Sequence, residues 1–391
     1  MDKDRPDKQP NLVLITTIIR EAPTGSQSGK LYLYDPEEQK VVRESAFPES
    51  DYIDLNDNPR GGLRGVWGMS SFGGKLAIAN SNTVFIFNTK WKLLHKIIHP
   101  CVSRVHDVYL EENSIWVTSS KNDLLVQLDF DNRILSYVDT RTLQSVTKIK
   151  AWRPKVFLTR KEILNRSNNY RDPRTLSEAY SDSAHLNSVL RLKDGRIFIS
   201  LGLQKRTSQY FLGNLKISLQ KSRLWKGVLC LDRVVKKAFF SKEGQNRESL
   251  FLVISHGFST IISLGENTMP EVILTLPGTT HPAHSIRQLS DGNVIYLCTT
   301  TGELILLDPA DGRILNKWQI GERYLRGACE LPDHSALLGD HCDVVRFNPT
   351  SQKVESRVTI TENRKEAIYD IHPLPVGFSL PPVSFERELL T

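Results

Sequence analysis

The sequence predicts an all-β protein, a β-propeller of six four-stranded blades that is closed by its two termini. Three observations predict this fold. A unit with four short β-type runs recurs along the chain, the starts of its copies are spaced as propeller blades are, and the two chain ends hold complementary parts of one copy.

The clearest copy spans residues 284–320. It holds four runs rich in β-branched or apolar residues, separated by Asp-Gly, Thr-Gly and Pro-Ala-Asp-Gly turn sequences. The runs are 284–289, 294–298, 304–308 and 314–320. This pattern predicts an antiparallel meander of four strands, which is too small to bury both of its faces alone and therefore has to stack against copies of itself.

Six starts of this unit can be aligned on a four-residue motif in the first strand. The motifs are 63–66, 105–108, 186–189, 283–286, 325–328 and 368–371. Three of the five intervals are 42 or 43 residues, which matches a propeller blade, and the other two are 81 and 97 residues. The long intervals predict insertions, and runs at 227–232, 237–240 and 250–254 leave a seventh blade open as an alternative.

Further strands are expected at the matching places in each copy. Second strands are predicted at 75–79, 115–119, 197–201, 294–298 and 336–338, and third strands at 84–88, 125–129, 260–264, 304–308 and 344–348. The chain begins with three strands that lack a first one, at 12–17, 30–35 and 41–47, and it ends with a lone first strand at 367–373. The termini are therefore predicted to share one blade, which leaves no open sheet edge.

The domain organisation follows from this repeat. Residues 1–10 are polar and are expected to be a disordered tail, and residues 11–391 are expected to form a single propeller domain. No export signal or transmembrane segment is visible, and the five cysteines are scattered without a C-x-x-C pair. These features predict reduced thiols and a cytoplasmic protein.

Two basic insertions stand out against the rest of the chain. Residues 141–180 carry a net charge of +7 and residues 203–249 carry +8, whereas the whole chain carries +7. Pro154 is placed to open a short basic helix in the first insertion. Such segments bind an acidic protein partner or an anionic membrane, cover a pocket, or form solvated loops. No RNA- or DNA-binding signature accompanies them, which argues against nucleic acid.

The first strands of a propeller line its central channel, so their equivalent residues form a ring. The second residue of each motif is polar in every copy: Arg64, His106, Asn187, His284, Arg326 and Tyr369. Blade closure makes Arg326, Tyr369 and Arg64 consecutive in this ring, which predicts a site for a carboxylate, sulfate or phosphate.

The remaining ring residues could act as acids, bases or metal ligands next to a bound anion. We assign His106, His284, Asp107, Asn187 and Tyr369 as candidate catalytic residues, and Arg64, Arg326, His185 and Trp67 as candidate substrate-binding residues. The cofactor is unknown. A transition metal held by histidines, calcium held by Asp107, Asn187 or Asp370, and a channel mouth that is polar only because it is wet all remain open.

Resemblance to known families supports a ligand site at the same place. The blade repeat resembles six-bladed propellers of the NHL-repeat, strictosidine-synthase-like and SMP-30-like group. The stretch HLNSV at 185–189 followed by KDGRI at 193–197 resembles the H-x-N-S-[VI]…DG stretch of arylsulfotransferase-like propellers. The resemblance implies a polar ligand site at the top of the channel, but it does not imply a particular reaction.

Two functions therefore remain as hypotheses, and the sequence does not decide whether the protein is an enzyme. The first is an intracellular enzyme that acts on an anionic or carrier-bound small molecule at the channel mouth. The alternative is a non-catalytic propeller that docks an acidic partner or an anionic membrane through its basic insertions.

Overall fold

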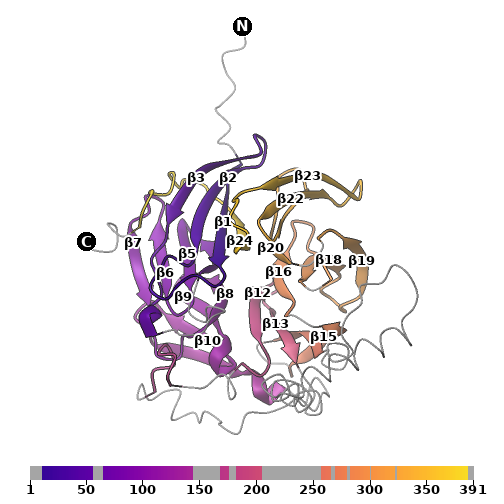
Figure 1. Cartoon of the computed structure of the whole chain (residues 1–391). Coiled ribbons are helices and arrows are strands. Elements are labelled where there is room, and N and C mark those ends of the chain that lie inside the picture. Colours follow the sequence, from indigo (N-terminus) through magenta and orange to yellow (C-terminus); the bar gives the residue numbers. More distant parts are fainter. Residues whose placement is uncertain are drawn as a thin grey trace, which may run out of the picture.

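The computed structural model describes residues 11–55, 65–143, 168–175, 182–204, 257–265, 269–279, 282–299, 301–321 and 324–385. Six four-stranded antiparallel sheets form a ring around a central channel (Figure 1). The inner strand of each sheet contacts the inner strands of both neighbours, so the ring is closed. The predicted β-propeller with six blades is confirmed.

The blades follow one another along the chain and each runs from its inner to its outer strand. Blade 1 holds β4 (Val66–Phe72), β5 (Lys75–Asn80), β6 (Val84–Asn88) and β7 (Leu93–Ile97). Blade 2 holds β8 (Val105–Leu110), β9 (Ser114–Ser119), β10 (Leu124–Asp129) and β11 (Ile134–Asp139). Blade 3 holds β12 (Leu186–Arg191), β13 (Ile197–Gln204), β14 (Gly257–Leu264) and β15 (Glu271–Thr279).

The remaining blades complete the ring. Blade 4 holds β16 (His284–Gln288), β17 (Val294–Cys298), β18 (Glu303–Leu307) and β19 (Ile314–Gln319). Blade 5 holds β20 (Leu325–Glu330), β21 (Ala336–Asp340), β22 (Asp343–Asn348) and β23 (Lys353–Thr359). Blade 6 holds β24 (Glu366–Pro373), β1 (Val13–Ile19), β2 (Lys30–Asp35) and β3 (Lys40–Ala46).

Short 3-10 turns are the only helical elements in these ranges, at Ile53–Leu55, Ser120–Asn122 and Thr140–Leu143. Within the described chain, no helix has the length and apolar character needed to cross a membrane.

The two ends of the chain share blade 6, as the sequence predicts. The C-terminal strand β24 is the innermost strand of this blade and pairs with β1 along its whole length, with Ile15 opposite Ile371. Beyond β24 the chain continues over blade 1, where Phe378 and Phe385 are buried against Trp91. The closure therefore combines backbone pairing with apolar anchors.

Each inner strand carries a bulge near its start, and this bulge corrects the register predicted for blade 1. In β8, Val105 pairs with Ser119 and the pairing resumes at Val108. In β4, the same interruption lies between Val66 and Met69. Val66 is therefore the equivalent of Val105, and the predicted motif at 63–66 is wrong by three residues.

The corrected register gives Trp67, not Arg64, as the ring residue of blade 1. Arg64 itself lies outside the described residues. The error arose because the sequence LRGV at 63–66 imitates LRGA at 325–328. Gly68 is the true counterpart of Gly327, since a Cβ on either glycine would lie 2.7–2.8 Å from the Cα of an aspartate in the next blade.

The third residue of the corrected motif joins neighbouring blades. Its side chain accepts a hydrogen bond from a backbone N–H of the next inner strand at four junctions. The pairs are Asp107 Oδ2 with Val189 N (3.3 Å), Ser188 Oγ with Ser285 N (2.9 Å), Ser285 Oγ with Gly327 N (3.0 Å) and Asp370 Oδ2 with Met69 N (2.9 Å). These bonds fix the inner strands, and hence the ring residues, relative to one another.

Replacement of Gly327 by alanine is expected to destabilise the fold more than the same change at Gly292. Both glycines have positive φ, 67° and 94°, but only at Gly327 would a Cβ meet backbone, at 2.8 Å from Asp370 Cα. We expect the loss at Gly327 to exceed that at Gly292 by about 1–3 kcal/mol, from overpacking. Urea unfolding of both variants measures this, and equal losses would contradict the close approach.

The basic insertions fall largely outside the described residues, including the helix predicted at Pro154 and the runs at 227–232, 237–240 and 250–254. Residues 168–175 of the first insertion contact blade 1. There the buried Arg171 pairs with Asp51 and donates to the carbonyl of Asn82 at 3.1 Å. The four described cysteines (101, 298, 329 and 342) are buried free thiols, and burial raises the pKa of Cys101, Cys298 and Cys329 to about 12.

Candidate functional site

Three histidines from three blades converge in the channel. His106 lies on β8, His284 begins β16, and His185 immediately precedes β12. One ring nitrogen of each lies within 4.8 Å of the others, and the ring of His106 lies 4.7 Å from that of His185 and 5.8 Å from that of His284. His106 and His284 were predicted as ring residues, and His185 joins them through the turn before its strand.

Asn187, the predicted ring residue of blade 3, lies at the same channel wall. Its amide nitrogen donates to the carbonyl of Ala283, which joins blade 3 to the start of blade 4. Its Oδ1 is buried without a hydrogen-bond partner among the described residues. The catalytic role predicted for Asn187 stays a prediction.

Each histidine is oriented through its Nδ1 atom. Nδ1 of His185 lies 2.8 Å from Asp182 Oδ2, Nδ1 of His284 lies 3.0 Å from Thr299 Oγ1, and Nδ1 of His106 is hydrogen-bonded to the hydroxyl of Tyr369. This shared arrangement leaves Nε2 of all three rings for another partner.

Two of the three tautomers follow from these contacts. A carboxylate only accepts, so His185 Nδ1 carries the proton that it donates to Asp182. The hydroxyl of Thr299 already donates to the carbonyl of Leu325 at 3.1 Å, so it accepts from His284 Nδ1. His284 Nε2 is consequently a bare acceptor, and it is buried without a hydrogen-bond partner in the described structure.

Burial and positive neighbours keep His106 and His284 neutral. Burial lowers the pKa of His106 and of His284 well below the ordinary value, and the nearby Arg326 guanidinium lowers both further. Burial raises the pKa of Asp182, but His185 and Arg104 outweigh burial and hold that pKa below its usual range. At neutral pH the site thus contains lone pairs on His106 and His284 beside an ionised Asp182.

Arg326 presents a buried positive charge next to this cluster. Its guanidinium lies 4.8 Å from the ring centre of Tyr369 and 4.9 Å from that of Tyr324, and the residue is 7% exposed. Its Nε has no hydrogen-bond partner, and none of the ion pairs between described residues includes it. A guanidinium that is stacked but not paired with a carboxylate is able to accept an anionic ligand.

Trp67 and Tyr369 form an aromatic wall of the same site. The ring of Trp67 lies 4.5 Å from that of His106 in an edge-on arrangement and 4.7 Å from that of Tyr369. Burial raises the pKa of Tyr369 well above the ordinary value, so its hydroxyl stays protonated. Trp67 was predicted as a substrate-binding residue, and the structure brings it to the cluster that Arg64 was expected to flank.

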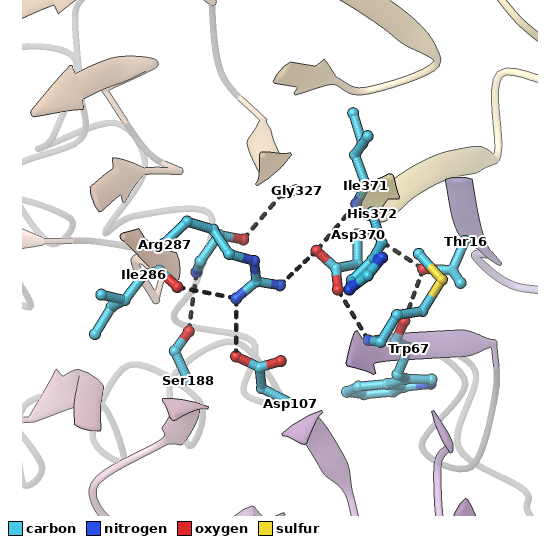
Figure 2. Close-up of polar contacts among 12 residues, drawn as sticks. Thr16, Trp67, Asp107, Ser188, Ile286, Arg287, Gly327, Asp370, Ile371 and His372 are labelled. Atoms are coloured by element: carbon cyan, nitrogen blue, oxygen red, sulfur yellow. Dashed lines mark hydrogen bonds and ion pairs between the residues drawn. The ribbon is translucent and has the colours of Figure 1, made fainter. Parts of the chain in front are cut away.

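Asp107 lies apart from the histidines, in an ion bridge that crosses the channel. Figure 2 shows the Arg287 guanidinium between Asp107 and Asp370, with Nη1 3.2 Å from Asp107 Oδ2 and Nη2 2.7 Å from Asp370 Oδ1. Arg287 follows His284 by three residues on β16, so the bridge lies further along the channel than the cluster. It links blades 2, 4 and 6.

The charges of this bridge depend on one another. Burial raises the pKa of Asp107, and Arg287 opposes that rise. Burial lowers the pKa of Arg287, but Asp370 and Asp107 outweigh burial and raise it. Both carboxylates take part in an internal ion pair, and the predicted calcium site and the catalytic role of Asp107 remain predictions.

Sequence reasoning missed four residues that shape the site: Arg287, Asp182, Thr299 and Tyr324. Arg287 carried a usable signal, since it is a charged residue three positions after a ring residue on a strand that lines the channel. The other three lie in the turns that precede or follow strands, where no periodicity marks them.

A scan against protein-family models and a search of curated proteins found no match. Among solved structures, the chain is similar to a protein of unknown function from Bacteroides caccae, with a TM-score of 0.50 and 9% identity over 94% of this chain and 99% of that chain. A nidogen/laminin complex gives a TM-score of 0.50 and 9% identity over 92% and 97%. These likenesses show the fold alone.

A weaker likeness, with a TM-score of 0.41 and 11% identity over 76% of this chain and 71% of that chain, is to virginiamycin B lyase from Staphylococcus aureus. The comparisons do not confirm the NHL, strictosidine-synthase-like or SMP-30-like group.

Proposed function

We propose that the channel mouth is the active site of an enzyme that acts on an anionic small molecule, free or attached to a carrier. The observation that carries this proposal is the buried guanidinium of Arg326, unpaired among the described residues. It lies beside a cluster of three histidines, of which His284 has a buried Nε2 without a hydrogen-bond partner in that part of the chain.

The anionic character of the substrate follows from the cost of burying a charge. A buried guanidinium without a counter-ion is unfavourable, so a carboxylate, sulfate or phosphate that reaches Arg326 gains a charge-assisted bond. Tyr324 and Tyr369 both contact the guanidinium through their rings, which limits its movement. Arg326 therefore binds the acidic group of the substrate.

The histidine cluster supplies the basic group of the reaction. His284 offers a lone pair at a buried Nε2, and the low pKa of His106 and of His284 keeps both rings unprotonated at neutral pH. Tyr369 keeps its proton and contacts both His106 and Arg326, so its hydroxyl lies where it can donate to a bound anion. Trp67 covers His106 and excludes water from this side.

Anion binding tests the role of Arg326. We expect sulfate, phosphate or acetate to bind the wild-type chain in calorimetry and the Arg326→Gln variant to bind at least about tenfold more weakly, which corresponds to about 1.4 kcal/mol. Arg313→Gln is the matched control, because Arg313 is 66% exposed on the outer part of blade 4. Equal affinities of wild type and Arg326→Gln would overturn the proposal.

A turnover assay tests whether the protein is an enzyme. Nitrophenyl sulfate and nitrophenyl phosphate, which keep an anionic group, are offered to the wild type and to His284→Gln, and the variant is expected to lose at least about 100-fold in kcat. Circular dichroism and thermal unfolding check that the variant is folded. Tight anion binding without hydrolysis of any ester would contradict an enzyme and favour a propeller that only binds.

A further inference from the structure

We infer that His106, His185 and His284 together hold one transition-metal ion of the zinc type through their Nε2 atoms. This inference deepens the proposed function and rests on it for the substrate alone, since the ligand set stands on the geometry of the histidines. The ion would occupy the channel mouth, beside Arg326 and above the Asp107–Arg287–Asp370 bridge.

The number and type of ligands fit such an ion. Three imidazoles with a fourth position open to solvent or substrate form the ligand set of catalytic zinc sites. The three ring nitrogens lie within 4.8 Å of one another, and they come from three separate blades whose inner strands are fixed by the hydrogen bonds described above. Nitrogens around one zinc ion lie about 3.3 Å apart, so small rotations of the rings complete the site.

The partners of the Nδ1 atoms fit a metal site equally well. Histidines that ligate metals donate the other ring N–H to a carboxylate, hydroxyl or carbonyl, which fixes the tautomer and the ring orientation. His185 has Asp182 in this position, and His284 has Thr299. In both rings this contact occupies Nδ1, so Nε2 is the nitrogen that we assign to the metal.

His106 completes the set through Tyr369. Ligation by its Nε2 places the ring proton on Nδ1, which then donates to the Tyr369 oxygen. The phenolic proton is thereby released for another acceptor. An anion bound between Arg326 and the metal would be that acceptor, so one arrangement satisfies His106, Tyr369 and Arg326 together.

A buried nitrogen without a hydrogen-bond partner is independent evidence for a ligand at this place. His284 Nε2 is a buried acceptor without a hydrogen-bond partner in the described structure, and the residue is 2% exposed. Buried polar atoms of this kind are rare, because their desolvation is not repaid. A metal ion at the centre of the three rings would pair with this atom.

The chemistry of the ligands selects the metal. Imidazole nitrogens suit zinc, copper, nickel and iron, whereas magnesium and calcium prefer oxygen. Arg326 repels a bare cation but attracts an anion, so a divalent ion and an anionic substrate favour each other at this site. We therefore expect Zn²⁺ to bind and Mg²⁺ not to bind.

Calorimetry on the full chain after EDTA treatment, without any anion, tests the site. We expect one Zn²⁺ per chain, no Mg²⁺ binding, and a loss of more than about 100-fold in Zn²⁺ affinity in each of His106→Gln, His185→Gln and His284→Gln. Asp182→Asn, which only orients His185, is expected to lose about 10–100-fold. His334→Gln is the control, because His334 is 73% exposed and remote from the cluster.

Cobalt gives a second readout that does not depend on activity. Co²⁺ bound by the three imidazoles is expected to show visible absorption that is lost in His284→Gln and kept in His334→Gln. If a variant of a ligand histidine fails to fold, the Zn²⁺ affinity of Asp182→Asn still tests the site, because this variant keeps all three histidines. Zn²⁺ binding that persists undiminished in the folded triple histidine variant, or tighter binding of Mg²⁺ than of Zn²⁺, would overturn the inference.

The two proposals fail in different ways. Arg326→Gln removes a neighbouring positive charge, so it is expected to leave Zn²⁺ affinity unchanged or higher while anion binding falls. Zn²⁺ binding with no effect of Arg326 on anions would overturn the proposed function alone. Anion binding that depends on Arg326, in a chain that binds no Zn²⁺, would overturn the metal site alone.

Discussion

Replacement of Arg287 by methionine is expected to lower the free energy of unfolding by about 3–5 kcal/mol at neutral pH. The guanidinium joins two buried carboxylates, at 3.2 Å from Asp107 and 2.7 Å from Asp370. Methionine has a similar length but no charge, so the variant leaves both aspartates without their partner. Urea unfolding of the metal-free chain at pH 8 measures the loss.

The loss should shrink as the pH falls. Burial and the charge of Asp370 both raise the pKa of Asp107, and the variant lacks Arg287, which is the strongest group that opposes this rise. A carboxyl whose pKa is higher in the folded than in the unfolded state binds a proton on folding, so the stability of the variant rises as the pH falls from 8 towards 5. In the wild type Arg287 opposes the shift of the Asp107 pKa, so the same rise in stability is expected to be smaller.

Two variants serve as controls for Arg287→Met. Arg313→Met changes an exposed arginine and is expected to alter stability by less than about 0.5 kcal/mol. The triple variant Asp107→Asn, Arg287→Met, Asp370→Asn removes all three charges and keeps an amide oxygen for the backbone N–H groups of Val108 and Ile371, but it loses the acceptors of Val189 N and Met69 N. It should recover part of the loss, and a triple variant as unstable as the single one would contradict the electrostatic explanation.

The fold could be predicted from the sequence because its signals are local. The Asp-Gly and Thr-Gly turns of residues 284–320 bound strands that the structure places at nearly the same residues, from β16 to β19. The shared blade at the termini was predictable because an incomplete blade leaves an unpaired edge at β1. Repetition supplied several independent copies of the same signals.

The site was predictable only in part, because it depends on register and on contacts between blades. The predicted alignment of blade 1 used Gly65 where the structure has Gly68, three residues later, so it gave Arg64 as the ring residue and not Trp67. Two glycines so close together fit the motif almost equally well, and the sequence pattern alone does not show which of them belongs to it. His106, His284 and Arg326 were found because they occupy regular ring positions. Arg287 was missed because its partners lie on β8 and β24, far away in the sequence.

The location of functional residues also has a physical reason. The inner strands are fixed at their bulges by side chains that bond to the next blade, so the ring positions before the bulges are held in place. Residues of the turns, such as Asp182 and Thr299, then orient the ring histidines from behind. The inner strands therefore position His106 and His284, and the neighbouring turns supply His185 and the contacts that orient the rings.

Ending the chain at residue 360 is expected to abolish cooperative folding, although five complete blades would remain. This change removes β24, and with it the buried side chains Ile368, Tyr369, Ile371, Phe378 and Phe385. Burial of five large apolar side chains contributes about 8–15 kcal/mol, which equals the whole stability of a typical domain. It also leaves β1 with an unpaired edge. Thermal unfolding followed by circular dichroism measures the loss.

A chain that ends at residue 385 is the matched control, since it keeps β24 and the buried Phe385 and is expected to melt as the full chain does. Closure by β24 also predicts that the missing strand can be supplied as a separate peptide. A separate peptide of residues 361–385 carries the strand and both phenylalanine anchors, so it should bind the shortened chain by adding a strand to β1 and restore a cooperative transition. Cooperative melting of the shortened chain without the peptide would show that the ring does not depend on this strand.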